Sequence, residues 1–357
     1  MKTTIFSLED IRTIVAHVGL DRIMDDAIAT LYEALEQYDT DKYAIPVREG
    51  FYYEDPELGL IEWMPALAYG GSVAIKVVGY HPANPKRLNI PTIMSTVLSF
   101  DTHNGHLVSV MDGNLLTAVR TGAASAVASR VLAHPDATTL GLIGCGAQAI
   151  SQVHALSRVF AIRRLLIHDS DPRAMQSFPK RLACLGLTDV DIISTRPEEL
   201  VAGVEMLCTQ TSVAVGGGPV FADEAIANNI HINALGSDFP GKMELPLSLL
   251  QRSLVCPDFR PQALREGECQ QVPEEHLGPD LVGLVQQREK YSVFRDQSTV
   301  FDSTGWALED YITVGLFTRY GLDLGCGTEL TLGNVAADPL NPYASLSVLR
   351  DVAKGAV

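Results

Sequence analysis

A glycine-rich motif near the middle of the chain has the residue types needed to bind a dinucleotide. Gly144-Cys145-Gly146-Ala147-Gln148-Ala149 reads G-x-G-x-x-A, follows an apolar run at 139–143 and is followed at once by a helical pattern. In this context Gly144 would make a tight turn, Gly146 would let the backbone approach a pyrophosphate, and Ala149 would keep the helix close to the strand. The pyrophosphate would lie at the positive end of that helix. By contrast, 325–327 has the same G-x-G spacing without a flanking strand, helix or acid, and predicts only a turn.

An acid stands at the distance that this motif requires. Asp169 lies 23 residues after Gly146, where the next apolar run, 165–167, ends. An acid at that position accepts hydrogen bonds from the ribose hydroxyls of a dinucleotide. Because a carboxylate repels a 2′-phosphate, the sequence predicts NAD(H) rather than NADP(H).

Five charged residues could form a site for an amino acid. Arg48, Lys76 and Arg120 offer three cations for a carboxylate, and Glu62 and Asp238 offer two acids for an amine. Asp238 follows an apolar run, so it would lie where ligands bind in an open parallel sheet. There it could act as a general acid and base.

Each of these residues has a structural alternative. Glu62 and Lys76 could face water from antiparallel strands, and Arg120 could be a solvated helix arginine. Asp238 could order the turn before Pro240. His81 more simply structures a loop, and we interpret 216–218 as a flexible loop rather than a second phosphate site.

The composition limits the class of partner. The chain has 357 residues, 46% of them hydrophobic, and a net charge of −16. The length suggests about two domains, and the charge argues against nucleic acid and anionic membranes. The excess of negative charge suits a cationic substrate, or it only makes the protein more soluble. We see no signal peptide and no run near the ~18 apolar residues of a membrane helix. The six scattered cysteines suggest a reduced, cytoplasmic protein, and no zinc-ligand spacing occurs.

The elements that must position these residues follow from the apolar periodicity. Residues 7–38 predict two helices broken near 19–21, with Ser7 and Asp10 as a capping box. Alternating runs within 43–110 predict a mainly antiparallel sheet with a hairpin at Asn104-Gly105. Residues 112–133 predict a long helix of small side chains.

From residue 137 onward, strands and helices alternate. The predicted strands are 139–143, 165–168, 189–194, 205–209, 230–235 and 253–257. This pattern indicates an α/β fold with a Rossmann-type, doubly wound parallel sheet, inserted into an α+β domain whose sheet is mainly antiparallel. We expect a substrate-binding and dimerisation domain at 1–122 plus 318–357, and an NAD-binding domain at 123–317. A helix after Leu308 and a loose, proline-containing end complete the chain.

Several long motifs resemble the ornithine cyclodeaminase/mu-crystallin family over roughly residues 5–345. They are 61–65 (IEWMP), 76–85 (KVVGYHPANP), 116–125 (LTAVRTGAAS), 144–149, 236–245 (GSDFPGKMEL), 266–268 (EGE) and 301–305 (FDSTG). Within the family, 231–234 (HINA) and 263–271 (ALREGECQQ) are most similar to bacterial lysine cyclodeaminases.

The resemblance implies roles residue by residue. It implies Asp238 and Glu62 as catalytic residues and Arg48, Lys76 and Arg120 as the carboxylate-binding cations. The implied cofactor contacts are Thr92, Thr121, Gly144, Gly146, Ala147, Gln148, Asp169, Ser170, Thr209, Lys242 and Ser303. No metal is implied, and dimers would form through the N-terminal sheet domain.

The resemblance also implies a reaction. It points to conversion of L-lysine to L-pipecolate and ammonia, with NAD recycled internally. The same family includes ornithine cyclodeaminases, which form L-proline, and NAD(P)H-dependent imine reductases and amino-acid dehydrogenases. It also includes non-enzymatic crystallins, so the fold alone does not determine the reaction.

Overall fold

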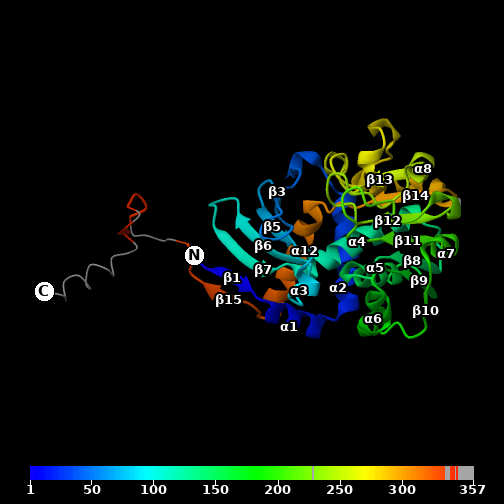
Figure 1. Cartoon of the computed structure of the whole chain (residues 1–357). Helices are drawn as coiled ribbons and strands as arrows, with labels where there is room; N and C mark the ends of the chain where they lie inside the picture. Colours follow the sequence, from blue (N-terminus) through cyan, green and yellow to red (C-terminus); the bar gives the residue numbers. More distant parts are fainter. Residues whose placement is uncertain (227–228, 334–337, 342, 345–357) are drawn as a thin grey trace.

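Two β-sheets, one mixed and one parallel, organise the computed structural model (Figure 1). It describes residues 1–357 except 227–228, 334–337, 342 and 345–357. Much of the predicted loose end, and the last part of the predicted range 318–357, therefore lie outside the described residues. No described helix combines the length and apolar character needed to cross a bilayer.

The first sheet has eight strands and contains both ends of the described chain. Its strands are β1 Thr3–Phe6, β2 Tyr43–Ala44, β3 Glu49–Tyr53, β4 Gly59–Ala68, β5 Ser72–Tyr80, β6 Ile93–Asp101, β7 Leu107–Asp112 and β15 Thr328–Leu330. Their order is β15-β1-β7-β6-β5-β4-β2, with β3 also paired to β4. All pairs are antiparallel except β1 with β7. The predicted antiparallel sheet and its hairpin at Gly105 (φ +75°) are confirmed.

Four strands of this sheet were not predicted. β1 and β15 are only four and three residues long, and they pair with each other near opposite ends of the chain. β2 has only two residues. β3 precedes Asp55 and Pro56 and is mostly exposed. Short or exposed strands lack the buried alternation by which a strand is recognised.

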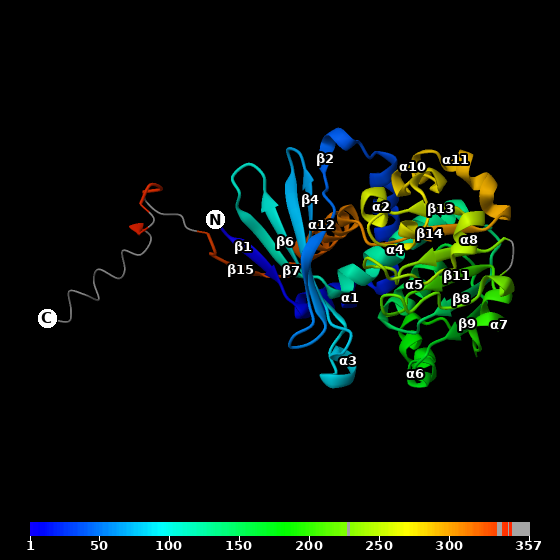
Figure 2. The same cartoon turned by 45° about the horizontal axis from the view of Figure 1, so that its top comes forward.

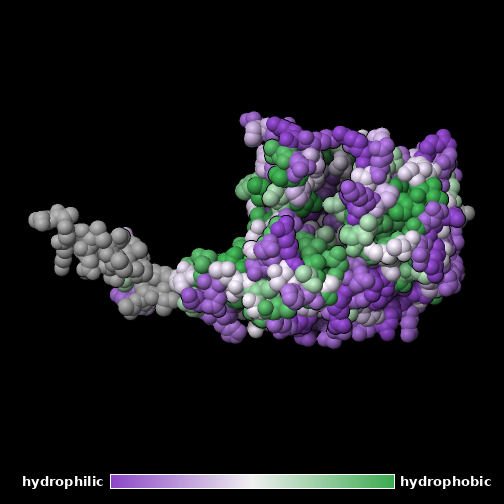
Figure 3. All heavy atoms as spheres, turned by 90° about the horizontal axis from the view of Figure 1, so that it is seen from below, coloured by the Kyte–Doolittle hydropathy of each residue, from purple (hydrophilic) through white to green (hydrophobic). Residues whose placement is uncertain are grey.

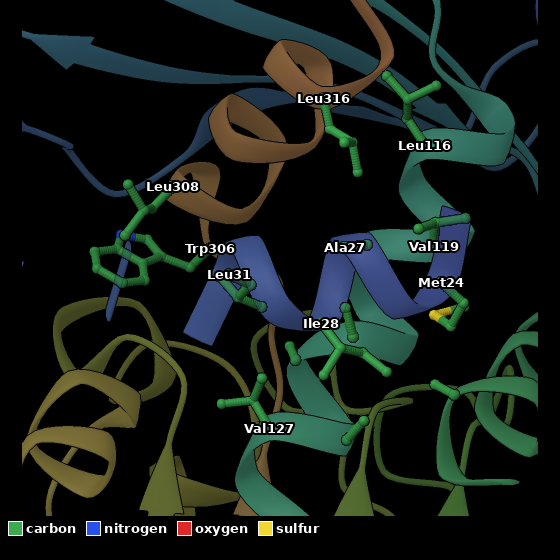
Figure 4. Packing of buried hydrophobic residues seen from close by; sticks show 14 of the residues in the cluster. Met24, Ala27, Ile28, Leu31, Leu116, Val119, Val127, Trp306, Leu308 and Leu316 are labelled. Carbon is green, nitrogen blue, oxygen red and sulfur yellow. The ribbon is translucent and has the colours of Figure 1, made fainter. Parts of the chain in front are cut away.

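Two helices, α4 (Asn114–Leu132) and α12 (Ala307–Asp323), pack on one face of the sheet. Helix α2 (Leu20–Glu36) packs against both of them and completes the main core, with α1 (Leu8–Val18) at the edge (Figures 2 and 4). Ile28 and Leu31 of α2 pack among Val119 and Val127 of α4 and Leu308 of α12.

The first two helices confirm the predicted boundary. Gly19, with φ +84°, separates α1 from α2, a backbone conformation that favours glycine. Ser7 and Asp10 form the predicted capping box.

The second sheet has seven strands, all parallel. They are β8 Thr139–Ile143, β9 Arg164–His168, β10 Asp191–Ser194, β11 Met206–Thr209, β12 His231–Ala234, β13 Leu254–Pro257 and β14 Thr299–Asp302. Their order, β10-β9-β8-β11-β12-β14-β13, is doubly wound about β8, as predicted. The four-residue strand β14 was missed, because it follows a long stretch of short helices.

Short helices flank this sheet and connect its strands. They are α5 Ala147–Ser157, α6 Pro172–Leu182, α7 Pro197–Ala202, α8 Leu247–Arg252, α9 Arg260–Ala263, α10 Leu281–Gln286 and α11 Arg288–Tyr291; α3, Asn84–Arg87, belongs to the first sheet's part of the chain. The 3-10 helices are η1 Thr40–Lys42, η2 Ala183–Leu185, η3 Asp223–Ala225, η4 Glu268–Gln271, η5 Glu274–His276 and η6 Ser292–Asp296.

Helix α4 joins the two halves of the molecule. It lies against α2 and α12 on one side and packs along α5 of the parallel sheet on the other (Figure 2). A Cβ on Gly122 would lie 2.8 Å from the Ser151 carbonyl oxygen, so this glycine permits the close approach of α4 to α5. Helices α4 and α12 run through residues 122–123 and 317–318, the predicted domain boundaries, so that division stays a prediction.

Candidate active site

The glycine motif forms the turn between β8 and α5. Gly144 has φ +96°, and a Cβ there would lie 2.8 Å from the Gln210 carbonyl oxygen. Gly146 is the N-cap of α5, and no side chain caps the helix. Both Gly146 and Ala147 are exposed, and the space that a Cβ on Gly146 would occupy is open. The uncapped N–H groups therefore face open space, as a pyrophosphate site requires.

The predicted ribose acid lies beside this turn. One carboxylate oxygen of Asp169 accepts a hydrogen bond from the Cys145 N–H (2.7 Å), and the other accepts one from the Asp171 N–H (2.8 Å). Ser170 is exposed next to it. The acid is thus fixed at the end of β9, next to the G-x-G turn, and the residues present fit an NAD molecule.

Two strand ends place further predicted cofactor residues at the same edge of the parallel sheet. Thr209 ends β11, where it is aligned with Ile143 of β8 and Ala234 of β12. Ser303 follows β14, donates its N–H to the Ala234 carbonyl, and has a buried hydroxyl without a hydrogen-bond partner among the described residues.

Three further predicted cofactor residues do not directly follow a strand of the parallel sheet. Gln148 is in the first turn of α5 and accepts a hydrogen bond from the Ser151 hydroxyl. The buried Thr121 lies on α4, where its hydroxyl bonds the carbonyl of Thr117. Thr92 belongs to the other sheet's part of the molecule, and its carbonyl accepts the His81 N–H.

The structure brings Arg48, Glu62 and Asp238 together. The Arg48 guanidinium lies 3.3 Å from a Glu62 oxygen and 2.8 Å from a Glu266 oxygen. It also donates to the backbone carbonyls of Asp238 (2.6 Å) and Thr304 (2.9 Å). Arg48 therefore connects β4 of the first sheet with two loops at the carboxyl edge of the second.

Lys76 and Arg120 form a second charged group. Lys76 Nζ lies 2.8 Å from Asp310 Oδ1, and Arg120 Nε lies 3.3 Å from the same oxygen. Arg120 Nη1 donates to Glu309 at 2.8 Å. Lys76 is only 1% exposed and Arg120 only 6%. The alternatives in which Lys76 and Arg120 face solvent are thus excluded, because both pair with acids of α12, which packs on β5 and α4.

The segment Thr304-Gly305 joins the two groups. Its Thr304 carbonyl binds Arg48, and a Cβ on Gly305 would lie 2.6 Å from Arg120 Nη1. Asp258 fixes this segment by accepting the Gly305 N–H (2.6 Å) and the Thr304 hydroxyl (3.0 Å). Arg48 and Arg120 therefore both contact one short turn after β14, and Asp310 links Lys76 to Arg120.

Asp238 carries a counter-ion. Lys242 Nζ lies 2.5 Å from Asp238 Oδ1 and 5.4 Å from the centre of the Tyr80 ring. Tyr80 ends β5, so this pair also lies where the two halves of the molecule meet. The Asp238 side chain is partly exposed. The space-filling view shows a hollow lined in part by hydrophobic residues (Figure 3).

Burial shifts the protonation of several of these groups. Desolvation raises the pKa of Glu62 and raises that of Glu266 to about 7, although Arg48 opposes both shifts. Desolvation, and then the charge of Arg120, lower the pKa of Lys76 to about 8, against the attraction of Asp310. Desolvation raises the pKa of Glu309 to about 8. The site can therefore hold and release protons near neutral pH.

Three acids in this site were not predicted from the sequence to have a role. Glu266, Glu309 and Asp310 are all buried against the predicted cations. Glu266 lies in a motif that carried the family resemblance. Glu309 and Asp310 stand in the first turn of α12, where acids are ordinary, so no local signal set them apart.

Three buried polar atoms in the site make neither a hydrogen bond nor an ion pair among the described residues. They are Glu309 Oε1, Asp310 Oδ2 and Ser303 Oγ. Unsatisfied buried polar atoms are costly. The two carboxylate oxygens would complement the ammonium of an amino-acid ligand.

Sequence and structure comparisons relate the chain to proteins with this fold. Residues 9–317 match the model of the ornithine cyclodeaminase/mu-crystallin family. The L-lysine cyclodeaminase of Streptomyces rapamycinicus is 40% identical over 347 residues, which cover 96% of this chain and 100% of that protein.

Two solved structures are similar over almost their whole length. A lysine cyclodeaminase, solved to explain its recognition of L-lysine, L-ornithine and L-2,4-diaminobutyric acid, has a TM-score of 0.93 at 43% identity, covering 96% of this chain and 99% of that one. An archaeal alanine dehydrogenase dimer with bound NAD has a TM-score of 0.81 at 28% identity, covering 93% and 100%. The chain belongs to the ornithine cyclodeaminase/mu-crystallin family.

Proposed function

We propose that this chain is an NAD-dependent cyclodeaminase that converts L-lysine to L-pipecolate and ammonia. The observation that carries the proposal is a pair of adjoining charged groups, Arg48 with Glu62 and the Asp238 loop, and Lys76 and Arg120 with Asp310, joined by the turn at Thr304-Gly305 after β14. Nearly full-length similarity to a lysine cyclodeaminase supports the same substrate class.

Each charged group has a task that its surroundings favour. Lys76, Arg120 and Arg48 bind the substrate carboxylate. Arg48 is itself held in place by the backbone carbonyls of Thr304 and Asp238. This orients Cα, and fixed orientation lowers the entropic part of the barrier. Asp238 accepts a proton from the amino group and returns one to the leaving ammonia, with Lys242 stabilising its charged form. Glu62, with its raised pKa, relays the proton of the distal amine.

NAD, when bound on the G-x-G turn and Asp169, supplies an acceptor and then a donor of hydride, so that the reaction has no net redox change. The protein's residues bind, orient and exchange protons with the amino acid. Closure of the two halves around the hollow keeps water from the intermediate imine.

An assay with catalytic amounts of NAD tests the proposal. Purified protein with L-lysine and substoichiometric NAD should release ammonia and pipecolate in equal amounts, while absorbance at the NADH band stays constant. Steady formation of NADH would instead identify an amino-acid dehydrogenase, and a requirement for added NADH would identify an imine reductase.

The same assay ranks the substrates. Ornithine is one methylene shorter than lysine, and a pocket distinguishes such a pair by only ~1–3 kcal/mol. We therefore expect measurable conversion of L-ornithine to L-proline, at a lower kcat/KM than lysine. A higher kcat/KM for ornithine would reassign the enzyme as an ornithine cyclodeaminase.

We also propose that the enzyme is a cytoplasmic homodimer. The face of β4 to β7 that α12 does not cover carries the exposed side chains of Ile61 and Met94 and a hollow of about 480 Å³. Exposed apolar faces of this kind mark protein interfaces. All six cysteines are unpaired, as in reduced compartments. Light scattering should give twice the chain mass of 38.6 kDa; a monomer would contradict the dimer.

A further inference from the structure

Asp310 lies between two of the cations that the proposed function uses. Its Oδ1 atom is 2.8 Å from Lys76 Nζ on β5 and 3.3 Å from Arg120 Nε on α4. Its side chain is 3% exposed, and the side chains of both cations are also buried. One oxygen on α12 thus joins three elements.

Without this acid, the two cations would face each other. Arg120 is the nearest positive neighbour that acts on Lys76, and Arg48 adds to the same repulsion. Asp310 offsets that repulsion, and Glu62 lies near enough to be influenced by Lys76. Two like charges held this close in a buried site need a fixed anion between them.

We propose that Asp310 is a positioning residue that holds Lys76 and Arg120 together as one carboxylate-binding pair and keeps Lys76 charged. The proposal deepens the proposed function, since it assumes that the pair binds a substrate carboxylate. The second oxygen of Asp310 is buried without a hydrogen-bond partner among the described residues, so the acid has capacity that the two cations do not use. Asp310 acts through Lys76 and Arg120, without itself being a proton carrier in the reaction.

The neighbouring acid Glu309 provides a matched control. It is also buried and also pairs with Arg120, at 2.8 Å, but it makes no ion pair with Lys76. Asp310→Asn removes the anion next to Lys76, whereas Glu309→Gln removes one carboxylate from Arg120 alone. The two variants therefore separate an effect on Lys76 from a general loss of buried charge.

The charge on Lys76 can be measured without any turnover. Lysine labelled with 13C at Cε and 15N at Nζ allows an NMR titration, and the Lys76 signal is identified by its absence in Lys76→Met. The pKa of Lys76 should be about 8 in the native protein and fall by ~1–3 pH units in Asp310→Asn. It should stay near 8 in Glu309→Gln. An unchanged value in Asp310→Asn would overturn the proposal.

Kinetics give the second readout. Neutral Lys76 cannot pair with a carboxylate, so kcat/KM for L-lysine should fall as the pH is raised, and this fall should begin at a lower pH in Asp310→Asn than in the native enzyme. The substitution should raise KM for L-lysine and change kcat at saturating lysine less than tenfold. A loss confined to kcat, with an unmoved pH profile, would show a structural role only.

A double variant keeps the test decisive if Asp310→Asn does not fold. Lys76→Met with Asp310→Asn removes both charges of the pair and leaves no isolated buried anion. If Asp310 acts through Lys76, the double variant should bind lysine about as weakly as Lys76→Met alone; a clearly weaker binding by the double variant would contradict the proposal. No turnover of lysine or ornithine by the native protein, together with the expected NMR shift, would refute the proposed function but not the pairing.

Discussion

Asp238 is the acid on which the proposed proton transfers depend. Its side chain is partly exposed, and its only ion-pair partner among the described residues is Lys242, at 2.5 Å. Its backbone carbonyl is held separately by Arg48. The position of this loop therefore does not depend on the charge of the Asp238 side chain.

Asp238→Asn should consequently stop catalysis while sparing the fold. The amide is nearly isosteric but cannot accept a proton from the substrate amine, and general acid–base catalysis contributes ~10²–10⁴-fold. We expect a loss of that size in kcat on lysine, with NAD affinity, measured by fluorescence titration, within about threefold of native. Near-normal turnover on lysine and ornithine would move the proton-transfer role to Glu62.

The spacing of residues in the sequence identifies only some of the residues that form the site. Asp238 and the glycine motif are revealed by the strands that precede them. Lys76 and Glu62, in contrast, have the alternation of residues that face water. Lys76 is buried against Asp310 of α12, 234 residues later, and Glu62 is buried beside Arg48. The family resemblance identified them where periodicity could not. Asp310 and Glu309 were missed because their partners are known only from tertiary packing.

At the scale of elements, the contact between α4 and α5 connects the substrate and nucleotide halves. Arg120 and Gly122 are on α4, whereas α5 begins at the G-x-G turn. Gly122 is the point where the backbones come close. A shift of α5 would therefore move the predicted pyrophosphate site relative to the cations.

Two helix glycines make a matched pair for testing this contact. In Gly122→Ala the new Cβ meets the Ser151 carbonyl at 2.8 Å and the Ala155 side chain at 3.0 Å, so α5 must shift. We expect ~1–3 kcal/mol of destabilisation and weaker NAD binding. Gly315→Ala on α12 meets nothing within 4 Å and should stabilise by ~0.5–1 kcal/mol. Denaturant unfolding and NAD titration measure both; equal effects of the two substitutions would show that the contact is not tight.

Element boundaries were predicted well where strands are buried and periodic. β8 matches its predicted range, and β9, β11, β12 and β13 differ by a residue or so at their ends. The missed strands are β1, β2, β3, β14 and β15, because short strands gain their stability from neighbours rather than from a local pattern. The order of β13 and β14 in the sheet is likewise a product of tertiary packing.

At the scale of the whole molecule, two halves with different tasks meet along one edge. The parallel sheet presents the glycine motif, Asp169 and Asp238, and the first sheet presents Lys76 and Glu62. Arg48 links the two sets through its contacts with Glu62 and the Asp238 carbonyl, and the space-filling view shows the molecule hollowed on one face (Figure 3). This arrangement explains how one site could remove hydrogen from a carbon and return it to the same carbon after ring closure.

The fate of the hydrogen on Cα tests that central claim most directly. L-Lysine carrying deuterium at C2 is incubated in ordinary water with the enzyme, catalytic NAD and an excess of unlabelled NADH, and the pipecolate is analysed by mass spectrometry and NMR. The account predicts that the deuterium stays at C2 of pipecolate, because the hydrogen is returned before the site opens. Pipecolate with ordinary hydrogen at C2, or no pipecolate at all, would contradict it.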